Sequence, residues 1–182
     1  MKTLKSFLLF IASMLVLSAC AKEEMWWEKN VAGEPPMVIT IPFEGEYLGI
    51  FESGGENIVK CCDGFSHTII DGTGTASCIG NSTMHFNFCS AVVDHGQACS
   101  YIVSGNGDSL YVCSQGEFIP GKLPEQPAYV TSYWRSQFVI RGGTGKFKGA
   151  SGGGMTDDYI SSEDALFHHH WTGTITMLIG NY

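Results

Sequence analysis

The chain has few basic residues and no apolar run long enough to cross a bilayer as a helix. Lysine and arginine number 10 against 18 aspartates and glutamates, which leaves a formal net charge of −8. An acidic chain repels phosphate backbones, so the composition predicts no nucleic-acid partner. The apolar run from Phe7 to Leu17 is shorter than the roughly 20 residues of a membrane-spanning helix, so a permanent span is not expected.

Motifs of common cofactor and metal sites are also missing. The chain contains no Cys-x-x-Cys pair, and the Gly145-Lys146 step is followed by Phe147 rather than by the serine or threonine of a phosphate-binding loop. The acid pairs Asp157-Asp158 and Glu163-Asp164 fall short of a calcium-binding pattern and are expected to solvate a loop. The sequence therefore predicts no cofactor and no catalytic residue.

The N-terminus has the layout of an export signal. Lys2 and Lys5 precede the apolar run, and the segment Leu17-Ser18-Ala19-Cys20 resembles the lipobox of bacterial lipoproteins. The resemblance implies cleavage before Cys20, lipid attachment to Cys20 and a place in the cell envelope. Outer-membrane anchoring is expected, with the protein facing the periplasm or exposed at the surface. An ordinary secretory signal is the alternative.

Three parts follow from this interpretation. We expect a lipoprotein signal peptide over residues 1–19 and a lipidated tether over residues 20–36, which is charged and carries Pro35-Pro36. A single β-barrel domain is expected over residues 37–182. No amphipathic helix of useful length follows the signal.

Six cysteines remain after Cys20 is assigned to lipid. They are Cys61, Cys62, Cys78, Cys89, Cys99 and Cys113. An even number in an exported chain predicts disulfides, but six cysteines allow 15 pairings and the spacing does not choose among them.

The rest of the chain consists of short strand-like segments separated by Gly, Asn, Asp and Pro. Alternation is clear in Met84, Phe86 and Phe88, and again between Trp171 and Ile179. Asn106-Gly107 is typical of a two-residue hairpin turn. The pattern predicts an all-β fold, a single antiparallel and roughly eight-stranded closed barrel, because closure removes exposed strand edges.

One glycine-rich string resembles a known signature. The segment from Gly142 to Gly152 is similar to the G-G-T-G-x-F-x-x-A-x-G motif of the dirigent and allene oxide cyclase barrel superfamily. Its matching residues are Gly142, Gly143, Thr144, Gly145, Phe147, Ala150 and Gly152. The resemblance implies a calycin-like, allene oxide cyclase-like barrel that is either filled by side chains or hollow enough for one small ligand. The motif itself is interpreted as a tight turn.

Aromatic residues are the candidates for lining such a cavity, with ordinary core packing as the alternative. The candidates are Tyr47, Phe51, Phe86, Phe88, Tyr111, Phe138 and Trp171. His168 and His170 share a strand face at the spacing of paired zinc ligands, but no third ligand is fixed, so no metal site is predicted.

The hypothesis from the sequence is a membrane-anchored, non-enzymatic lipoprotein whose barrel binds a small apolar ligand or a partner protein. One alternative is a cyclase or isomerase, as the resemblance implies. The other is a structural or interaction protein with a filled barrel. The sequence predicts no particular oligomeric state.

Overall fold

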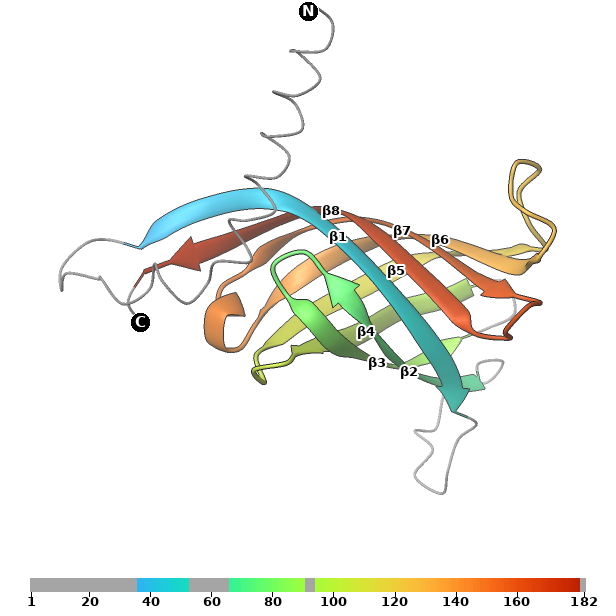
Figure 1. Cartoon of the computed structure of the whole chain (residues 1–182), viewed down its shortest axis with the longest axis horizontal. Helices are drawn as coiled ribbons and strands as arrows, with labels where there is room; N and C mark the ends of the chain where they lie inside the picture. The colour runs from blue at the N-terminus through green and yellow to red at the C-terminus, as the bar shows by residue number, and fades with distance from the viewer. Residues whose placement is uncertain (1–35, 53–65, 91–93, 181–182) are drawn as a thin grey trace, which may run out of the picture. The chain divides into compact units, whose positions relative to one another are not determined.

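The computed structural model describes residues 36–52, 66–90 and 94–180, in which eight strands form a closed antiparallel barrel in sequence order (Figure 1). The strands are β1 (Met37–Glu52), β2 (Ser66–Ala76), β3 (Gly80–Ser90), β4 (Asp94–Ser104), β5 (Ser109–Pro120), β6 (Val130–Gly143), β7 (Ser151–Ser161) and β8 (Phe167–Ile179). The expected closed eight-stranded barrel is therefore confirmed. None of the described residues forms a helix long and apolar enough to cross a membrane.

Side-chain alternation along the strands separates the lumen from the outer wall. On β1, Phe43 and Tyr47 are buried inside the barrel, whereas Leu48 and Ile50 are exposed. The same period of two runs through β5, where Leu110 and Val112 are buried. Each strand therefore contributes alternate residues to the interior.

One end of the lumen is filled by an aromatic core. Phe138 stacks on Trp171 with ring centroids 5.2 Å apart, and Phe43 packs on Phe138 at 5.7 Å. Other side chains buried with them are Met84, Ile102, Leu110, Ile140, Phe147 and Ile175. This end needs no ligand to be stable, because its apolar side chains fill one another's gaps.

The glycine-rich motif closes the filled end against the hairpin between β4 and β5. It turns the chain from β6 through a single 3-10 turn, η2 (Gly145–Phe147), into β7. Thr144 and Ser109 exchange two hydrogen bonds of 2.8 Å, and the backbone N–H of Lys146 donates to Asp108 at 3.3 Å. Phe147 is fully buried beneath the turn. The motif is therefore a turn that fixes two loops together, as its glycines predict.

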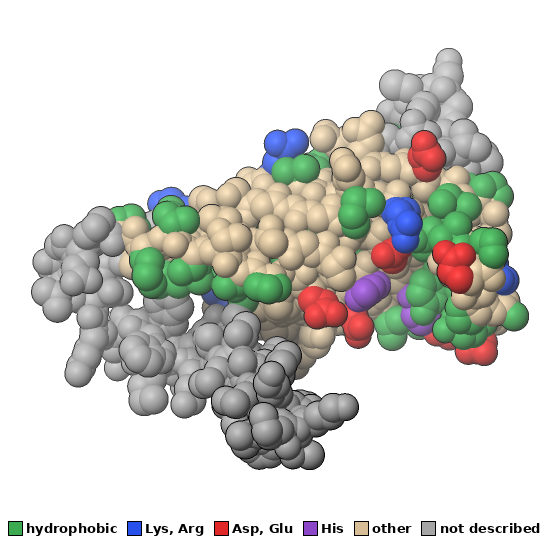
Figure 2. All heavy atoms as spheres, turned by 90° about the horizontal axis from the view of Figure 1, so that it is seen from above, with side chains coloured by type: hydrophobic (Ala, Val, Ile, Leu, Met, Phe, Trp, Pro, Cys, Tyr) green, Lys and Arg blue, Asp and Glu red, His purple; other side chains and the backbone are tan. Residues whose placement is uncertain are grey.

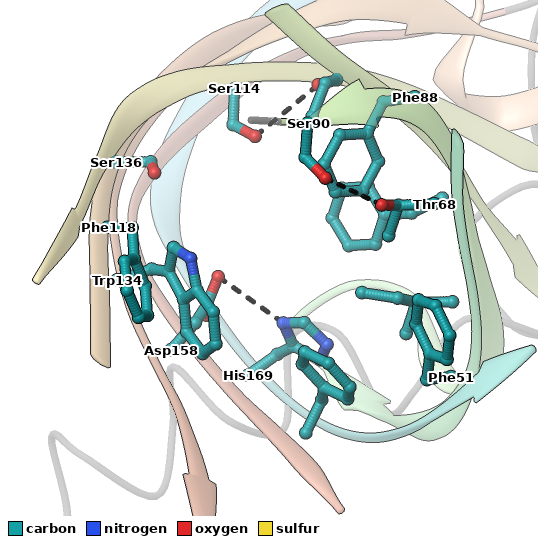
Figure 3. A pocket seen from close by; sticks show the side chains of 14 residues that line it. Phe51, Thr68, Phe88, Ser90, Ser114, Phe118, Trp134, Ser136, Asp158 and His169 are labelled. Carbon is teal, nitrogen blue, oxygen red and sulfur yellow. Dashed lines mark hydrogen bonds and ion pairs between the residues drawn. The ribbon is translucent and has the colours of Figure 1, made fainter. Parts of the chain in front are cut away.

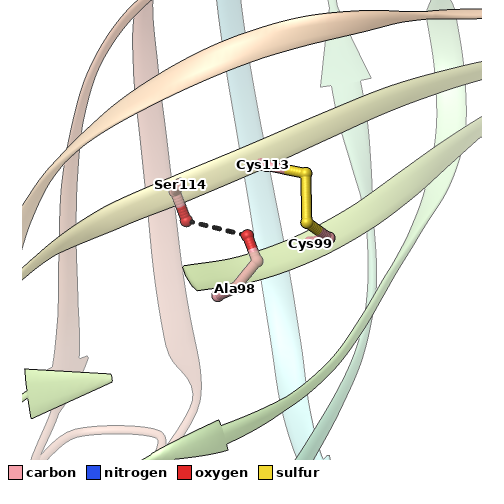
Figure 4. Close-up of a disulfide and its surroundings, with 4 residues drawn as sticks. All are labelled: Ala98, Cys99, Cys113 and Ser114. Atoms are coloured by element: carbon pink, nitrogen blue, oxygen red, sulfur yellow. Dashed lines mark hydrogen bonds between the residues drawn. A yellow bond between two sulfur atoms is a disulfide. The ribbon is translucent and has the colours of Figure 1, made fainter. Parts of the chain in front are cut away.

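A disulfide joins Cys99 on β4 to Cys113 on β5, which are register partners (Figure 4). Cys78 and Cys89 are disulfide-bonded as well. These bonds support the expectation of disulfides. Cys20, Cys61 and Cys62 lie outside the described residues.

Candidate functional site

The half of the lumen opposite the glycine-rich turn contains a cavity of about 360 Å³ (Figure 3). Six aromatic side chains line it: Phe51, Phe86, Phe88, Phe118, Trp134 and Phe167. Its polar lining residues are Thr68, Ser90, Ser114, Ser136, Asp158 and His169. The cavity is thus mostly apolar with a few polar groups, which is the usual composition of a small-molecule site.

Small inward-facing residues leave this half open. Ala98 and Ser114 are register partners on β4 and β5, and both are buried against the lumen. Ser136 on β6 is small as well, so three neighbouring strands each contribute one small buried side chain to the lining. Space remains where Ala98, Ser114 and Ser136 line the lumen, because their side chains are too small to fill it.

Four of the lining residues form a belt across four adjacent strands. Register pairs join Phe118 to Trp134, Trp134 to Asp158, and Asp158 to His169. The rings of Phe118 and Trp134 lie 5.1 Å apart, and the ring of Phe167 lies 5.8 Å from Trp134. The belt therefore places a carboxylate and an imidazole directly beside a continuous aromatic wall.

Asp158 is the acidic group of the pocket. The indole N–H of Trp171 donates to its Oδ1 at 3.2 Å, while its Oδ2 lies 3.4 Å from Nδ1 of His169. The second contact is within ion-pair distance but does not have hydrogen-bond geometry, because both His169 ring nitrogens lack a hydrogen-bond partner in the described structure. The side chain of Asp158 keeps 15% of its surface exposed, so the carboxylate can meet a ligand.

His169 is more deeply buried, with 4% of its side chain exposed. Its ring lies 5.6 Å from that of Phe86 and is nearly parallel to that of Phe167 at 6.2 Å. The absence of a side chain at Gly49 leaves room for the imidazole, because a Cβ there would lie 3.1 Å from Nε2. Figure 3 shows the ring reaching from its strand toward the middle of the cavity.

Hydroxyl groups on other walls of the cavity are bonded within the protein. Thr68 and Ser90 share a hydrogen bond of 2.8 Å, and Ser114 donates to the carbonyl of Ala98 at 3.4 Å. These hydroxyls therefore stabilise the strands around the cavity. They are less available to hydrogen-bond a ligand than the side chains of Asp158 and His169.

The aromatic residues named from the sequence fall into three groups. Phe51, Phe86 and Phe88 line the cavity. Phe138 and Trp171 also face the lumen but belong to the packed core. Tyr47 shares that core and bonds Ser82 at 2.9 Å, and burial raises the pKa of Tyr47 to about 12.

Tyr111 requires a correction. It lies on the outer face of β5 with 43% of its surface exposed, so it does not line the cavity. Its neighbours Leu110 and Val112 are the buried residues, and strand alternation turns Tyr111 away from them.

His168 and His170 point to the outside of β8. His168 stacks on Tyr159 at 4.5 Å and lies 3.0 Å from Asp164, and His170 is 3.8 Å from Glu44. A backbone hydrogen bond from Leu166 and the nearby His168 lower the pKa of Asp164. Within the described ranges, no group of three or more His, Cys, Asp or Glu side chains could hold a metal ion.

Asp158, His169, Phe118, Trp134 and Phe167 were not anticipated as site residues. His169 lies two positions before Trp171, so the alternation that turns Trp171 inward also turns His169 inward. The expectation that Asp157 and Asp158 solvate a loop is wrong, because both lie within β7.

The chain matches no protein-family model, no curated protein and no solved structure.

Proposed function

We propose that this chain is a lipid-anchored binding protein of the cell envelope that holds a small, largely apolar molecule in the open half of its barrel. The observation that carries this proposal is the cavity itself. One end of the lumen is packed with side chains, yet the other end keeps about 360 Å³ of space between six aromatic side chains.

The dimensions and chemistry of the cavity limit its occupant. A volume of about 360 Å³ is at the small end of the roughly 300 to 1,000 Å³ typical of small-molecule sites. Aromatic walls favour a molecule with a flat or hydrocarbon body, which gains from leaving water and from stacking on rings. A compound with one or two rings, or a short branched chain, fits both conditions.

The envelope location is supported by the segment that ends at Cys20, with its small residues before a cysteine. Two or more acyl chains on that cysteine would anchor the protein stably, since each buried methylene contributes roughly 0.8 kcal/mol. The resemblance to dirigent and allene oxide cyclase barrels supports the scaffold only. Its motif forms a turn, and none of its residues lines the cavity.

Native mass spectrometry tests the binding function. The whole chain, released gently from membranes of its own host, is expected to carry a small molecule that is lost when the protein is denatured. A protein that is isolated only in the free state and also takes up no neutral aromatic probe, such as 2-ethylnaphthalene, would contradict the proposal. A filled or collapsed barrel acting through its outer surface would then be favoured.

A cyclase or isomerase is the second candidate, and the Asp158–His169 pair favours it. An imidazole beside a carboxylate in an apolar cavity is suited to moving a proton on a bound molecule. Exchange of deuterium from heavy water into 2-tetralone, followed by NMR, tests this candidate. Exchange no faster with the wild-type chain than with a His169→Phe variant excludes it.

A further inference from the structure

Among the described residues, the pocket is lined by one acidic side chain and by no fixed positive charge. Of the described residues that line it, only Asp158 and His169 can carry a charge, and neither lysine nor arginine is among them. A carboxylate in an apolar cavity is costly unless a cation or several hydrogen bonds compensate it. Within the part of the chain that the structure describes, the side chain of Asp158 receives one hydrogen bond, from Trp171, and its other oxygen has only the poorly aligned His169 nearby.

The aromatic wall beside Asp158 is suited to a positive charge. Trp134 is the register partner of Asp158, and the rings of Phe118 and Phe167 flank Trp134 at 5.1 and 5.8 Å. The faces of aromatic rings carry negative electrostatic potential and attract ammonium groups within about 6 Å. A nitrogen placed against Asp158 would therefore meet a carboxylate and aromatic faces together.

The charge around the open end favours the same kind of ligand. Acidic residues outnumber basic ones there in the described structure: Glu52, Glu117, Glu125, Asp157, Asp158, Glu163 and Asp164 against Lys122 and Arg135. In Figure 2 most of the visible acidic and histidine side chains lie in the half of the barrel at the right of the view. Together with the net charge of −8, this surface attracts cations and repels anions.

We propose that the pocket binds an organic cation, a protonated or quaternary amine on a small apolar body, with its positive nitrogen against the carboxylate of Asp158. The body of the ligand lies along Trp134, Phe118 and Phe167. This inference rests on the proposed binding function and specifies its ligand. It requires His169 to remain neutral in the bound state, because an imidazolium would itself neutralise Asp158.

Two probes of nearly equal shape test the assignment. 2-(Aminomethyl)naphthalene carries an ammonium group where 2-ethylnaphthalene carries a methyl group. Binding of both to the whole chain in zwitterionic lipid nanodiscs is measured by tryptophan fluorescence, with empty discs subtracted. The ratio of the two affinities is then compared between variants, because partition of the probes into lipid is the same for each variant and cancels.

Asp158→Asn removes the charge but keeps an acceptor for the indole N–H of Trp171. We expect it to reduce the preference for the ammonium probe by about tenfold or more, since hydrogen bonds between charged groups are the strong ones. Asp157→Asn is the matched control. Asp157 is the preceding residue, faces outward and pairs with Arg135 at 2.9 Å, so its loss should leave the preference unchanged.

The outcomes separate this inference from the proposed function. Equal preference in wild type and Asp158→Asn overturns the cation assignment and leaves an apolar pocket. Failure of both probes to bind the wild-type chain overturns the binding function as well. If Asp158→Asn does not fold, the wild-type chain still decides: binding of anionic 2-naphthylacetate as tight as that of the ammonium probe overturns the assignment.

Discussion

Asp157 and Asp158 are consecutive on β7, yet their carboxylates lie on opposite sides of the barrel wall. Asp157 pairs with Arg135 at 2.9 Å on the outside and accepts a hydrogen bond from Tyr133. Asp158 accepts a hydrogen bond from Trp171 inside the lumen. Strand alternation alone therefore decides which of two identical side chains is solvated and which gives the cavity its charge.

Filling the cavity should abolish binding without unfolding the barrel. Ser114→Leu places a larger apolar side chain among the small residues that line the cavity. It also removes the 3.4 Å hydrogen bond from Ser114 to the carbonyl of Ala98, which costs about 1 kcal/mol. We expect the affinity for 2-ethylnaphthalene to fall at least about tenfold, while the melting temperature changes little because new apolar contacts offset the lost bond. Gln115→Leu, at an exposed position on the outer face of β5, is the control and should bind the probe normally.

An unchanged affinity in Ser114→Leu would place the probe outside the lumen and remove the support for an internal site.

The barrel could be predicted from the sequence because its strands alternate. Met84, Phe86 and Phe88 were placed on one face, and the first two are buried while Phe88 lines the cavity. The prediction for Tyr111 is wrong because an aromatic side chain can occupy either face of a strand, and on β5 the inward positions belong to Leu110 and Val112. His169 lies between two outward-facing histidines. The residue types in the run His168-His169-His170 are identical, so they do not indicate that His169 is the one that lines the cavity.

The belt of Phe118, Trp134, Asp158 and His169 could not be predicted, because it depends on strand register. Asp158 meets His169 only through the pairing of β7 with β8. β7 begins with Ser151 and three glycines, so its sequence shows no alternation of polar and apolar side chains there. The residues that point into the lumen therefore could not be predicted for this strand. The division of the lumen into a filled and an open half likewise depends on which layers of side chains meet across the barrel.

The glycine-rich turn should tolerate no side chain at Gly143. A Cβ there would clash with the carbonyl oxygen of Ser109 and with Phe147, so Gly143→Ala must displace the backbone that joins two loops. We expect a loss of about 3 kcal/mol or more in the free energy of unfolding, measured with urea. Gly107→Ala is the comparison, because that position has a φ of 92° but open space around it. Its cost should be about 1 kcal/mol.

Similar losses in the two glycine variants would mean that the turn can move away from Ser109, and that backbone conformation alone determines the cost.

The Cys99–Cys113 disulfide should stabilise the barrel by constraining its unfolded state. The two residues are 14 positions apart, and a loop of this size corresponds to about 3 kcal/mol in the chain-entropy account. A Cys99→Ser/Cys113→Ser double variant is therefore expected to unfold at lower urea concentration than the wild-type chain under non-reducing conditions. Both proteins should retain probe binding at low urea, because neither cysteine lines the cavity.

A double variant as stable as the wild-type chain would show that the cross-strand hydrogen bonds already hold β4 against β5.

Lipid attachment can be tested at Cys20, which lies outside the described residues. Cys20→Ala removes the thiol to which the acyl chains would be joined, so the protein should move from the membrane fraction to the soluble fraction of a host lysate. Cys99→Ser is the control for the loss of a cysteine, and it should remain with membranes. A Cys20→Ala chain that still sediments with membranes at high salt would contradict the lipid anchor.

Alkaline pH should destabilise the barrel through Tyr47. Burial raises its pKa to about 12, whereas an unfolded chain ionises near 10, so the folded state binds the proton more tightly. Stability is therefore fully present below pH 10 and declines as the pH rises from 10 toward 12. The free energies of unfolding of the wild-type chain and of Tyr47→Phe, measured with urea at pH 9 and near pH 11.5, isolate this residue from Tyr133, whose pKa is also about 12.

At pH 9 the wild-type chain should be more stable than Tyr47→Phe by about 1 kcal/mol, because the variant lacks the hydrogen bond to Ser82. Near pH 11.5 the difference should shift by roughly 2 kcal/mol toward the variant, since only the wild-type chain gains from ionising this side chain on unfolding. A difference that stays constant between the two pH values would mean that the Tyr47 hydroxyl reaches water in the folded barrel. The filled end of the lumen would then be open to solvent.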